Sequence, residues 1–410
     1  MWPPLIRNAW LCICLIAATG ESAILALPCQ QSQPPAQANE EDGASIAAAS
    51  EVQDKNPNAE SAQSENKTSD EQKKKKTPRG SIVAAPLPIV SPALGSGVVP
   101  VLGYIFALST KDKISPPSVI GAAGLITNDG SRGFLVGGRL YVKENRYQVE
   151  AAFANGNLNY NLYGGDYLSG LKGAKLPLKQ DGRVFFGEAM MNVGHKLFIG
   201  PRVWIGSSIV TIRQQNNDVI APPEIGLHSE LVALGIIATR DTSSNRFYPL
   251  KGSFLNITGD FFTKGLGSKY SFQSYRFTFD KYISLSERQV LAYNAFVCLT
   301  GGDPPFYGNC IYGANNELRG YTAGRFLDRY MLATQLEYRL VLPKRFGLVG
   351  FGGLGGVIPG AHQPRSSHFL PDIGTGLRYE LSKKYHVNLR VDVAKGNGDY
   401  TWAVGVGEAF

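Results

Sequence analysis

Two features are absent from the chain: a long apolar run, and Phe or Tyr side chains in the first eighty residues. No apolar run reaches the roughly eighteen residues that a membrane-spanning helix needs. The first eighty residues contain no Phe or Tyr, and their only aromatic side chains are Trp2 and Trp10. A polytopic helical membrane protein is therefore excluded, and a core can form only beyond residue 80. A β-barrel is not excluded, because alternating strands average to the near-neutral mean hydropathy of −0.10.

Charged side chains are scarce as well, at 18% of 410 residues, with a formal net charge of +8. Residues 28–80 hold seven basic and nine acidic side chains and residues 1–27 are neutral, so residues 81–410 carry +10. A basic balance often indicates nucleic-acid binding, but these cations are dispersed and form no Lys/Arg stripe. We expect no nucleic-acid partner.

The residue patterns of common enzymes are also missing. There is no Gly-x-Ser-x-Gly elbow, no paired-Cys or His-x-x-x-His metal spacing, and the five His are scattered. The Gly-rich stretch 350–356 opens no helix, so it does not fit a phosphate-binding loop. Glycine there is better suited to a barrel wall that bends sharply or accommodates an inserted loop. We expect no enzyme, no metal and no cofactor.

The N-terminal region has the pattern of an exported protein. Arg7 precedes an apolar run over residues 9–18, and small residues follow, which is typical of a signal peptide over residues 1–27. Residues 28–80 are polar, without aromatics, and cannot bury enough surface to offset chain entropy, so we expect a disordered linker. Its basic end, Lys73–Lys76, either contacts an anionic surface or is simply solvated.

Beyond residue 80 the dominant pattern is alternation with a period of two. In residues 386–394, Val, Leu, Val and Val occupy one face, and Asn, Arg and Asp the other. Residues 331–342 behave likewise, and the last segment places Tyr400, Trp402 and Phe410 together. A soluble sandwich would show the same alternation with its faces reversed. Export, strand length and the aromatic ending favour an all-β, transmembrane antiparallel barrel over residues 81–410, in the outer membrane of a Gram-negative bacterium.

Counting the alternating segments gives fifteen candidate strands, and residues 158–169 are the best sixteenth. Because bacterial barrels prefer even numbers, we predict sixteen strands, with fourteen as the alternative. The fifteen candidates are 97–109, 117–127, 132–142, 146–156, 183–197, 200–213, 229–241, 252–264, 269–282, 287–299, 331–342, 346–358, 368–381, 385–395 and 400–410.

One connection, residues 300–330, is much longer than the others and follows the eleventh strand. Cys298 and Cys310 bracket a Gly/Pro-rich stretch within it. In an exported protein these two cysteines are candidates for a disulfide, although two free thiols would give the same sequence. Long connections in compact folds are usually functional or disordered, and this composition is not that of a disordered segment.

At Leu318-Arg319-Gly320-Tyr321 the chain resembles the BamA/TamA family of outer-membrane assembly factors, in its surface-antigen barrel domain. Gly324, Asp328 and residues 337–339 are spaced as in that family's loop and following strand. Further similarities are residues 88–97 at the start of the barrel, the D…FYP…G turn in residues 240–252, and the ending from Gly405 to Phe410. The resemblance covers roughly residues 85–410 and implies sixteen strands with the Arg-Gly-Tyr loop after the eleventh.

The resemblance implies that this loop folds back into the lumen, where Arg319 meets an acidic side chain. The family's Asp, two residues after a Phe on the thirteenth strand, is missing here, because Phe351 is followed by two glycines. Glu337, Asp372 and Asp392 are the candidate replacements. A guanidinium in a narrow lumen pairs best with a carboxylate that it can bind in a bidentate manner. A solvated loop arginine is the alternative.

The resemblance also implies a role in inserting or translocating outer-membrane components. Family members use a weak seam between their first and last strands, and Gly405 and Gly407 would weaken a closing strand that ends at Phe410. The family's periplasmic POTRA domains are not recognisable in residues 28–80. The alternative is a passive or gated pore or a structural surface barrel. Expected partners are outer-membrane lipids and client outer-membrane proteins, around a monomeric barrel.

Overall fold

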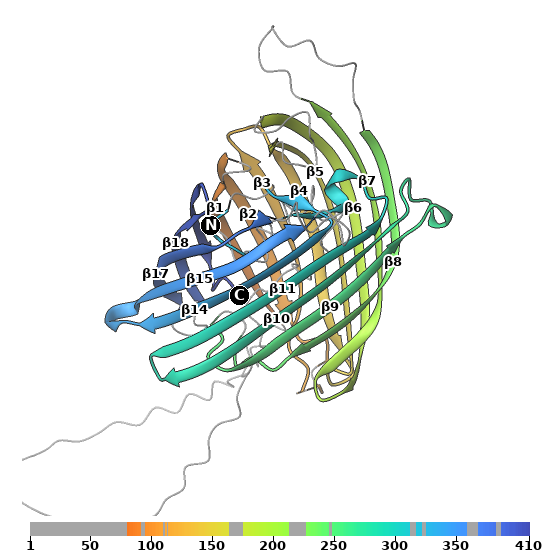
Figure 1. Ribbon diagram of the computed structural model, residues 1–410. Helices are drawn as coiled ribbons and strands as arrows, with labels where there is room; N and C mark the ends of the chain where they lie inside the picture. Colours follow the sequence, from red (N-terminus) through yellow and green to blue (C-terminus); the bar gives the residue numbers. More distant parts are fainter. Residues whose placement is uncertain are drawn as a thin grey trace, which may run out of the picture. The chain divides into compact units, whose positions relative to one another are not determined.

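The structure is a computed structural model in which one long antiparallel sheet curls into a barrel (Figure 1). It describes residues 80–410 except for 92–94, 110, 113, 164–174, 213–226, 246–247, 312–316, 322–324, 359–367 and 383–386. The expected signal peptide and nearly all of the expected linker lie outside the described residues. Within the described part of the chain, no helix has the length and hydropathy needed to cross a membrane.

Sixteen long strands form the wall, so the predicted number is confirmed. Each pairs antiparallel with the next long strand in the chain. They are β1 (Gly80–Ser91), β2 (Gly95–Phe106), β3 (Ser118–Thr127), β4 (Arg132–Val142), β5 (Tyr147–Tyr163), β6 (Lys175–Gly194), β7 (Leu197–Ile212), β8 (Leu227–Asp241), β9 (Gly252–Phe262), β10 (Phe272–Ser286), β11 (Gln289–Gly302), β14 (Tyr330–Val341), β15 (Phe346–Ile358), β17 (Asp372–Ser382), β18 (Val387–Gly396) and β19 (Asp399–Val406). The short β16 (His368–Phe369) extends the sheet beside β15.

One predicted strand is wrong and one was missed. Of the expected strand 158–169, residues 158–163 are not a separate strand, because β5 runs without interruption from Tyr147 to Tyr163 against β6. Residues 164–169 lie outside the described residues. The first strand is instead β1, which pairs along its whole length with β2. The long connection nevertheless follows the eleventh strand, because the missed strand and the extra one both precede it.

The first and last strands of the sheet meet without a ladder. β1 and β19 approach each other, but among the described residues no backbone pairing joins them, whereas every other pair of neighbouring long strands has one. The sheet therefore has two free edges that face each other along a seam.

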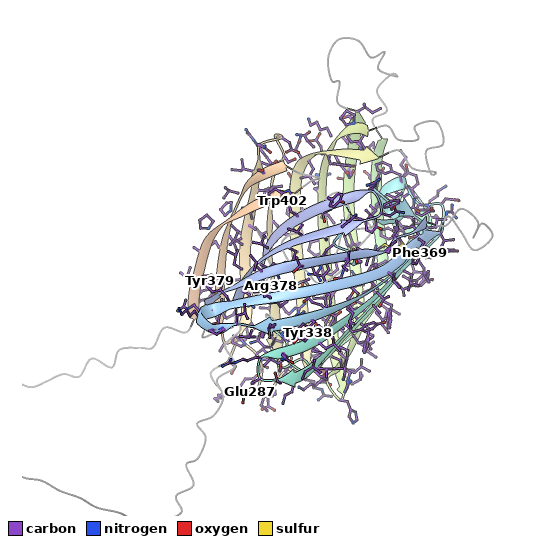
Figure 2. All side chains as sticks on the ribbon, turned by 60° about the vertical axis from the view of Figure 1, so that its left-hand side comes forward. Glu287, Tyr338, Phe369, Arg378, Tyr379 and Trp402 are labelled. Carbon is purple, nitrogen blue, oxygen red and sulfur yellow. A yellow bond between two sulfur atoms is a disulfide. The ribbon has the colours of Figure 1, made fainter. Side chains whose placement is uncertain are left out.

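The two faces of the wall have the chemistry that the alternation predicts. Leu332, Leu336 and Tyr338 of β14 are exposed on the outside, while Gln335 and Glu337 are buried on the inside. Along β17 and β19, Tyr379 and Trp402 project outward, whereas Arg378 is buried on the lumenal side (Figure 2). Apolar side chains that would be unfavourable in water are compatible with lipid, so this wall suits a membrane.

The connections define the orientation of the barrel. Because the number of long strands is even, β1 starts and β19 ends at the same end of the sheet. At that end most turns are short, as at 195–196 and 287–288, with longer ones at 107–117 and 242–251; the longest connection between successive long strands, 303–329, lies at the opposite end. Short turns are periplasmic in such barrels, so the long loop belongs to the extracellular end.

The closing segment differs from the prediction in one respect. β19 contains Gly405 but ends at Val406, so Gly407 and Phe410 are not part of the strand. Gly407 has a left-handed φ of 86°, and the chain after it turns into the lumen. The main-chain oxygen of Phe410 accepts a hydrogen bond of 2.8 Å from the buried Arg339. Phe410 is therefore not part of a lipid-facing aromatic girdle.

Candidate functional site: the lumenal loop and its two walls

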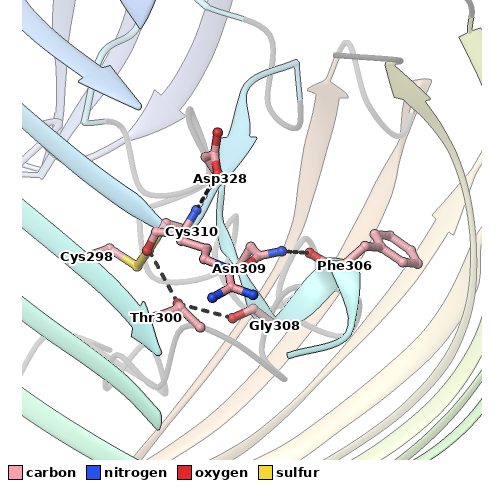
Figure 3. The surroundings of a disulfide bond; sticks show 8 residues. Cys298, Thr300, Phe306, Gly308, Asn309, Cys310 and Asp328 are labelled. Atoms are coloured by element: carbon pink, nitrogen blue, oxygen red, sulfur yellow. Dashed lines mark hydrogen bonds between the residues drawn. A yellow bond between two sulfur atoms is a disulfide. The ribbon is translucent and has the colours of Figure 1, made fainter. Parts of the chain in front are cut away.

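The long loop between β11 and β14 is fixed to β11 at its start. A disulfide joins Cys298 on β11 to Cys310 in the two-residue strand β12 (Cys310–Ile311), with their Cα atoms 5.8 Å apart (Figure 3). The Thr300 hydroxyl donates to the carbonyl of Gly308 at 3.3 Å. β12 in turn pairs with β13 (Leu327–Asp328) on the returning leg of the loop. The loop is thus a built element, and the disulfide expected from the sequence is present.

The first leg of the loop packs against an apolar layer inside the barrel. A short 3-10 turn, η3 (Phe306–Gly308), buries Tyr307 almost completely. Its neighbours in this layer include Phe262 and Phe272, whose rings stack with centroids 4.2 Å apart. The layer continues over lumenal residues of β2 to β8, among them Leu135, Phe186, Trp204 and Leu231. This part of the lumen is therefore filled by hydrocarbon side chains.

The second leg carries Leu318, Arg319, Gly320 and Tyr321, all of which are buried. The Arg319 guanidinium forms ion pairs with Glu337 on β14 and, at 2.9 Å, with Asp392 on β18. Both carboxylates are side chains that the alternation places on the inner face of their strands, and the loop positions the arginine between them. The structure thus places Arg319 inside the barrel, within reach of two of the three candidate acids.

Two further contacts complete the surroundings of the Arg319 guanidinium. Its Nε donates to the side-chain oxygen of Gln335 at 3.0 Å. Its central carbon lies 3.4 Å from the centroid of the Phe351 ring, a cation–π contact. Phe351 thus contacts the arginine through its ring, and the carboxylates come from β14 and β18 instead of β15.

Asp372, the third candidate, has a different partner. Its carboxylate accepts the backbone N–H of Gly320 at 3.0 Å, and no direct ion pair between Asp372 and the Arg319 side chain occurs in the described part of the lumen. Gly320 is required at this place, because a Cβ there would lie 2.8 Å from the Asp372 side chain and from the backbone of Gly396. Asp372 therefore holds the backbone of the motif, and Glu337 and Asp392 hold its charge.

The Gly-rich part of β15 makes room for the loop. A Cβ on Gly353 would come within 2.4 Å of a Leu318 methyl group. Gly350, by contrast, has nothing within 4 Å of its Cβ position. The interpretation that glycine accommodates an inserted loop therefore applies to Gly353 and does not extend to the whole stretch.

The motif also binds the hairpin that ends the sheet. The Tyr321 hydroxyl donates to the Pro371 carbonyl at 2.7 Å and accepts the backbone N–H of Asn397 at 3.0 Å. The Thr401 hydroxyl on β19 donates to the carbonyl of Arg319. Because Asn397 and Thr401 belong to the β18–β19 hairpin, the loop contacts the strand at the seam.

Sequence reasoning missed the charge network next to Arg319. Arg339 pairs with Glu337 at 2.6 Å, and Arg378 pairs with Asp392 at 2.6 Å. Arg378 also binds Glu408 at 2.8 Å. The inward face of the alternation could have indicated both arginines. Glu408 follows the end of β19, where alternation no longer applies.

The D…FYP…G turn lies close to the same network. It connects β8 to β9 at the periplasmic end, and Gly252 there has a left-handed φ of 104°. Burial raises the pKa of Tyr248 to about 12, with a smaller contribution from the negative charge of Glu408. A neutral phenol therefore borders the charged cluster.

The opposite wall holds charges of its own. Arg139 on β4 binds Glu150 on β5 with its Nε at 2.5 Å, and Arg202 on β7 lies 3.2 Å from Asp260 on β9. All four side chains are buried. Both pairs join strands of the wall to each other, so they stabilise the wall itself.

Comparisons with known proteins agree with this architecture. Residues 208–410 match the family described as the Omp85 superfamily domain. BamA from Haemophilus ducreyi lacking POTRA domains 1–3 superposes with a TM-score of 0.53 at 14% identity, over 80% of this chain and 68% of that chain. CdiB from Escherichia coli gives 0.53 at 12% identity, over 80% and 62%. No match was found among curated proteins. At these identities the solved structures show the fold, and the chain spans only about two thirds of their length.

Proposed function

We propose that the protein inserts or translocates outer-membrane components, because residues 208–410 match the Omp85 superfamily domain and belong to an outer-membrane β-barrel of a Gram-negative bacterium. The substrates in this proposal are unfolded chains that present a β-strand to the barrel. In this proposal the substrates do not pass through the lumen, which holds the docked loop and the apolar layer. They enter through the wall of the barrel, at the seam between β1 and β19.

The seam between β1 and β19 carries the proposal. Two strand edges that face each other without a ladder leave backbone N–H and C=O groups unpaired, and such edges are templates for an added strand. In a membrane those groups gain more from a partner than they do in water, because lipid offers no hydrogen bonds. A client strand that pairs with either edge would therefore be stabilised.

Two local features support a seam that opens. Gly405 in β19 removes a side chain from the closing strand, which weakens its packing. Pro86 and Pro100, opposite each other in β1 and β2, cannot donate to the ladder, and proline is tolerated mainly in edge strands. The loop contacts to Thr401 give the docked loop a direct hold on β19.

Depletion of the protein in its own cells tests the proposal. We expect other outer-membrane barrels to lose their heat-resistant folded form and to accumulate as unfolded chains in the periplasm. Unchanged assembly of all of them after complete depletion would overturn it.

A disulfide lock across the seam tests the route. Ala84→Cys in β1 is combined in turn with single cysteines along β19, and the pair that oxidises most completely is kept. Rescue of depleted cells should fail with the oxidised pair and return on reduction. The matched control joins β2 to β3 through Leu102→Cys and Ala122→Cys, which already face each other. Rescue by the locked seam at the level of the control would rule out the seam as the route.

The alternative function is a passive or gated pore, in which the net charge of +10 over residues 81–410 would favour anions. Planar-bilayer conductance before and after deletion of residues 303–328 tests it. A large anion-selective conductance of the intact protein supports the pore. A closed intact protein that conducts only after the deletion fits a plugged barrel and leaves the seam as the working part.

A further inference from the structure

Strands β5 and β6 are longer than a membrane crossing requires. They contain 17 and 20 residues, whereas about 9–11 residues are enough for a tilted strand to span the hydrocarbon core. The excess lies at the extracellular end, where β5, β6 and β7 rise beyond the neighbouring hairpins (Figure 1). This part of the outer surface therefore passes through the headgroup region of the outer leaflet.

The outward side chains of these strands change character at one level. Phe153 on β5 faces Phe185 on β6, and both belong to the apolar outer belt. The next outward pair toward the extracellular end is Asn155 and Arg183. The change occurs at the same level on β5 and β6, and on β4 it comes one outward position later, where Phe134 is opposite Asn155 and Arg132 is opposite Asn157. This step marks the outer boundary of the hydrocarbon core on these three strands, and polar groups follow above it.

Two arginines flank the asparagines of β5 at this boundary. Arg183 on β6 is opposite Asn155, and Arg132 on β4 is opposite Asn157. The two arginine strands lie on either side of β5, which places them about 10 Å apart across the sheet. Both arginine residues are exposed. The Arg183 Nε donates to the Ser207 hydroxyl at 2.9 Å, which orients its guanidinium along the surface.

The nearby acid does not cancel these charges. Asp181 accepts a hydrogen bond from the Asn157 amide and lies 3.4 Å from the Lys179 ammonium. Lys179 therefore compensates Asp181, and within the described part of this surface no ion pair involves Arg132 or Arg183. Two guanidinium groups remain as a net positive charge directly above the apolar belt.

We propose that this surface binds the phosphate groups of a phosphorylated glycolipid in the outer leaflet. The guanidinium fork matches the geometry of a phosphate, which it can bind in a bidentate manner. The amides of Asn155 and Asn157 between the two arginines offer donors and acceptors for sugar hydroxyls. The belt below, at Phe153 and Phe185, contacts the acyl chains of the same molecule. A lipid with two phosphates on a sugar headgroup fits two arginines separated by an asparagine-lined strand.

The test measures binding of fluorescent diphosphorylated lipid A to the full-length protein in detergent. Arg132→Gln combined with Arg183→Gln should weaken binding at least tenfold, because both charge-assisted contacts to the phosphates are lost. Arg132→Lys combined with Arg183→Lys keeps the charges and removes the forks, and should give an intermediate loss. Retention of the heat-resistant folded form on electrophoresis confirms that each variant folds.

The matched control removes two charges at the periplasmic end, by Lys143→Gln and Lys344→Gln in exposed turns, and should leave lipid A binding unchanged. Dephosphorylated lipid A should fail to compete, and phosphatidylglycerol should compete weakly. Equal affinity of the arginine double variant and the wild type would overturn the proposal. Equal competition by phosphatidylglycerol would overturn the glycolipid, because it would mean that any anionic lipid satisfies the surface.

Discussion

The two sides of the lumen hold the same loop by different forces. On the β14–β19 side, the Arg319 guanidinium is enclosed by Glu337 and Asp392, with further arginines behind them. On the β2–β10 side, Tyr307 packs in a layer of aromatic and aliphatic side chains that includes Phe272. Ion pairs hold the loop on the first side, the ionic side, and apolar packing holds it on the second, the apolar side.

The difference predicts two kinds of failure. Removal of one member of a buried charge network leaves its partner charged, buried and unpaired, and the cost is large. Removal of apolar volume costs the lost contacts and the cavity, and the neighbouring side chains partly relax. The ionic side should therefore release the loop in one step, whereas the apolar side should loosen gradually.

The largest effect is expected for Arg319→Ala. Glu337 and Asp392 would lose their common partner, and docking of the loop in the lumen should be destabilised by about 3–5 kcal/mol. Limited proteolysis should then cleave the loop in the intact barrel. Arg319→Lys, which keeps the charge without the fork, should show partial protection. An unchanged protease pattern in Arg319→Ala would mean that the apolar side alone holds the loop.

A smaller effect is expected for Phe272→Ala on the apolar side. The Phe262 ring would lose the Phe272 ring that stacks on it, and the free energy of unfolding, measured by urea denaturation, should fall by about 3 kcal/mol. The loop should remain protected from protease, because the ion pairs of the ionic side are intact. Phe277→Ala, on the outer face of the same strand, is the control and should cost less. If Phe272→Ala released the loop, the two sides would not be independent.

The disulfide comes next in size. Cys298→Ser combined with Cys310→Ser should lower stability by about 2–3 kcal/mol, because the bond closes a loop of about a dozen residues. Reductant should shift the urea midpoint of the wild type and leave the double variant unchanged. A shift of the same size in both would show that the effect does not come from this bond.

The smallest effect provides a reference outside both walls. Asp112, in the periplasmic turn between β2 and β3, accepts hydrogen bonds from the backbone of Ser115 at 2.9 Å and of Glu144 at 2.9 Å. These bonds, those to Ser115 first, lower its pKa to about 2. Because the pKa falls on folding, the stabilisation is present above the unfolded value of about 3.9 and is lost as the pH falls through about 2.

Amide hydrogen exchange at Glu144 checks this reference. Exchange protection should decrease below pH 4 in the wild type and should be low at every pH in Asp112→Ala. The protease resistance of the loop should not follow that titration. If it did, the two turns joined by Asp112 would be coupled to the lumen.

The sequence predicts the wall better than the contents of the lumen. Alternation correctly places Gln335 and Glu337 inside, because the period of two follows from strand geometry alone. β1 was missed because it contains neither Phe nor Tyr and includes Pro86 and Pro88, which argue against a strand except at an edge. The break expected after residue 156 is absent, because β5 continues through Asn155, Gly156 and Asn157 in register with β6.

The partners of Arg319 could be narrowed but not chosen. Alternation indicates that Glu337 and Asp392 point inward, but it does not give their height in the barrel. Height depends on strand tilt and stagger, which a sequence of strands does not specify. Glu408 was out of reach for another reason, because the left-handed turn at Gly407 redirects the chain after the last strand.

The position of the disulfide has a consequence for the order of assembly. Cys298 and Cys310 are separated by only 12 positions and both precede β14 to β19 in the chain. Closure of so short a segment is fast compared with the pairing of distant strands, so the bond can form before the ionic side, β14 to β19, has folded. A barrel completed in that order wraps its last five strands around a segment that is already tethered, and it never has to open to admit one.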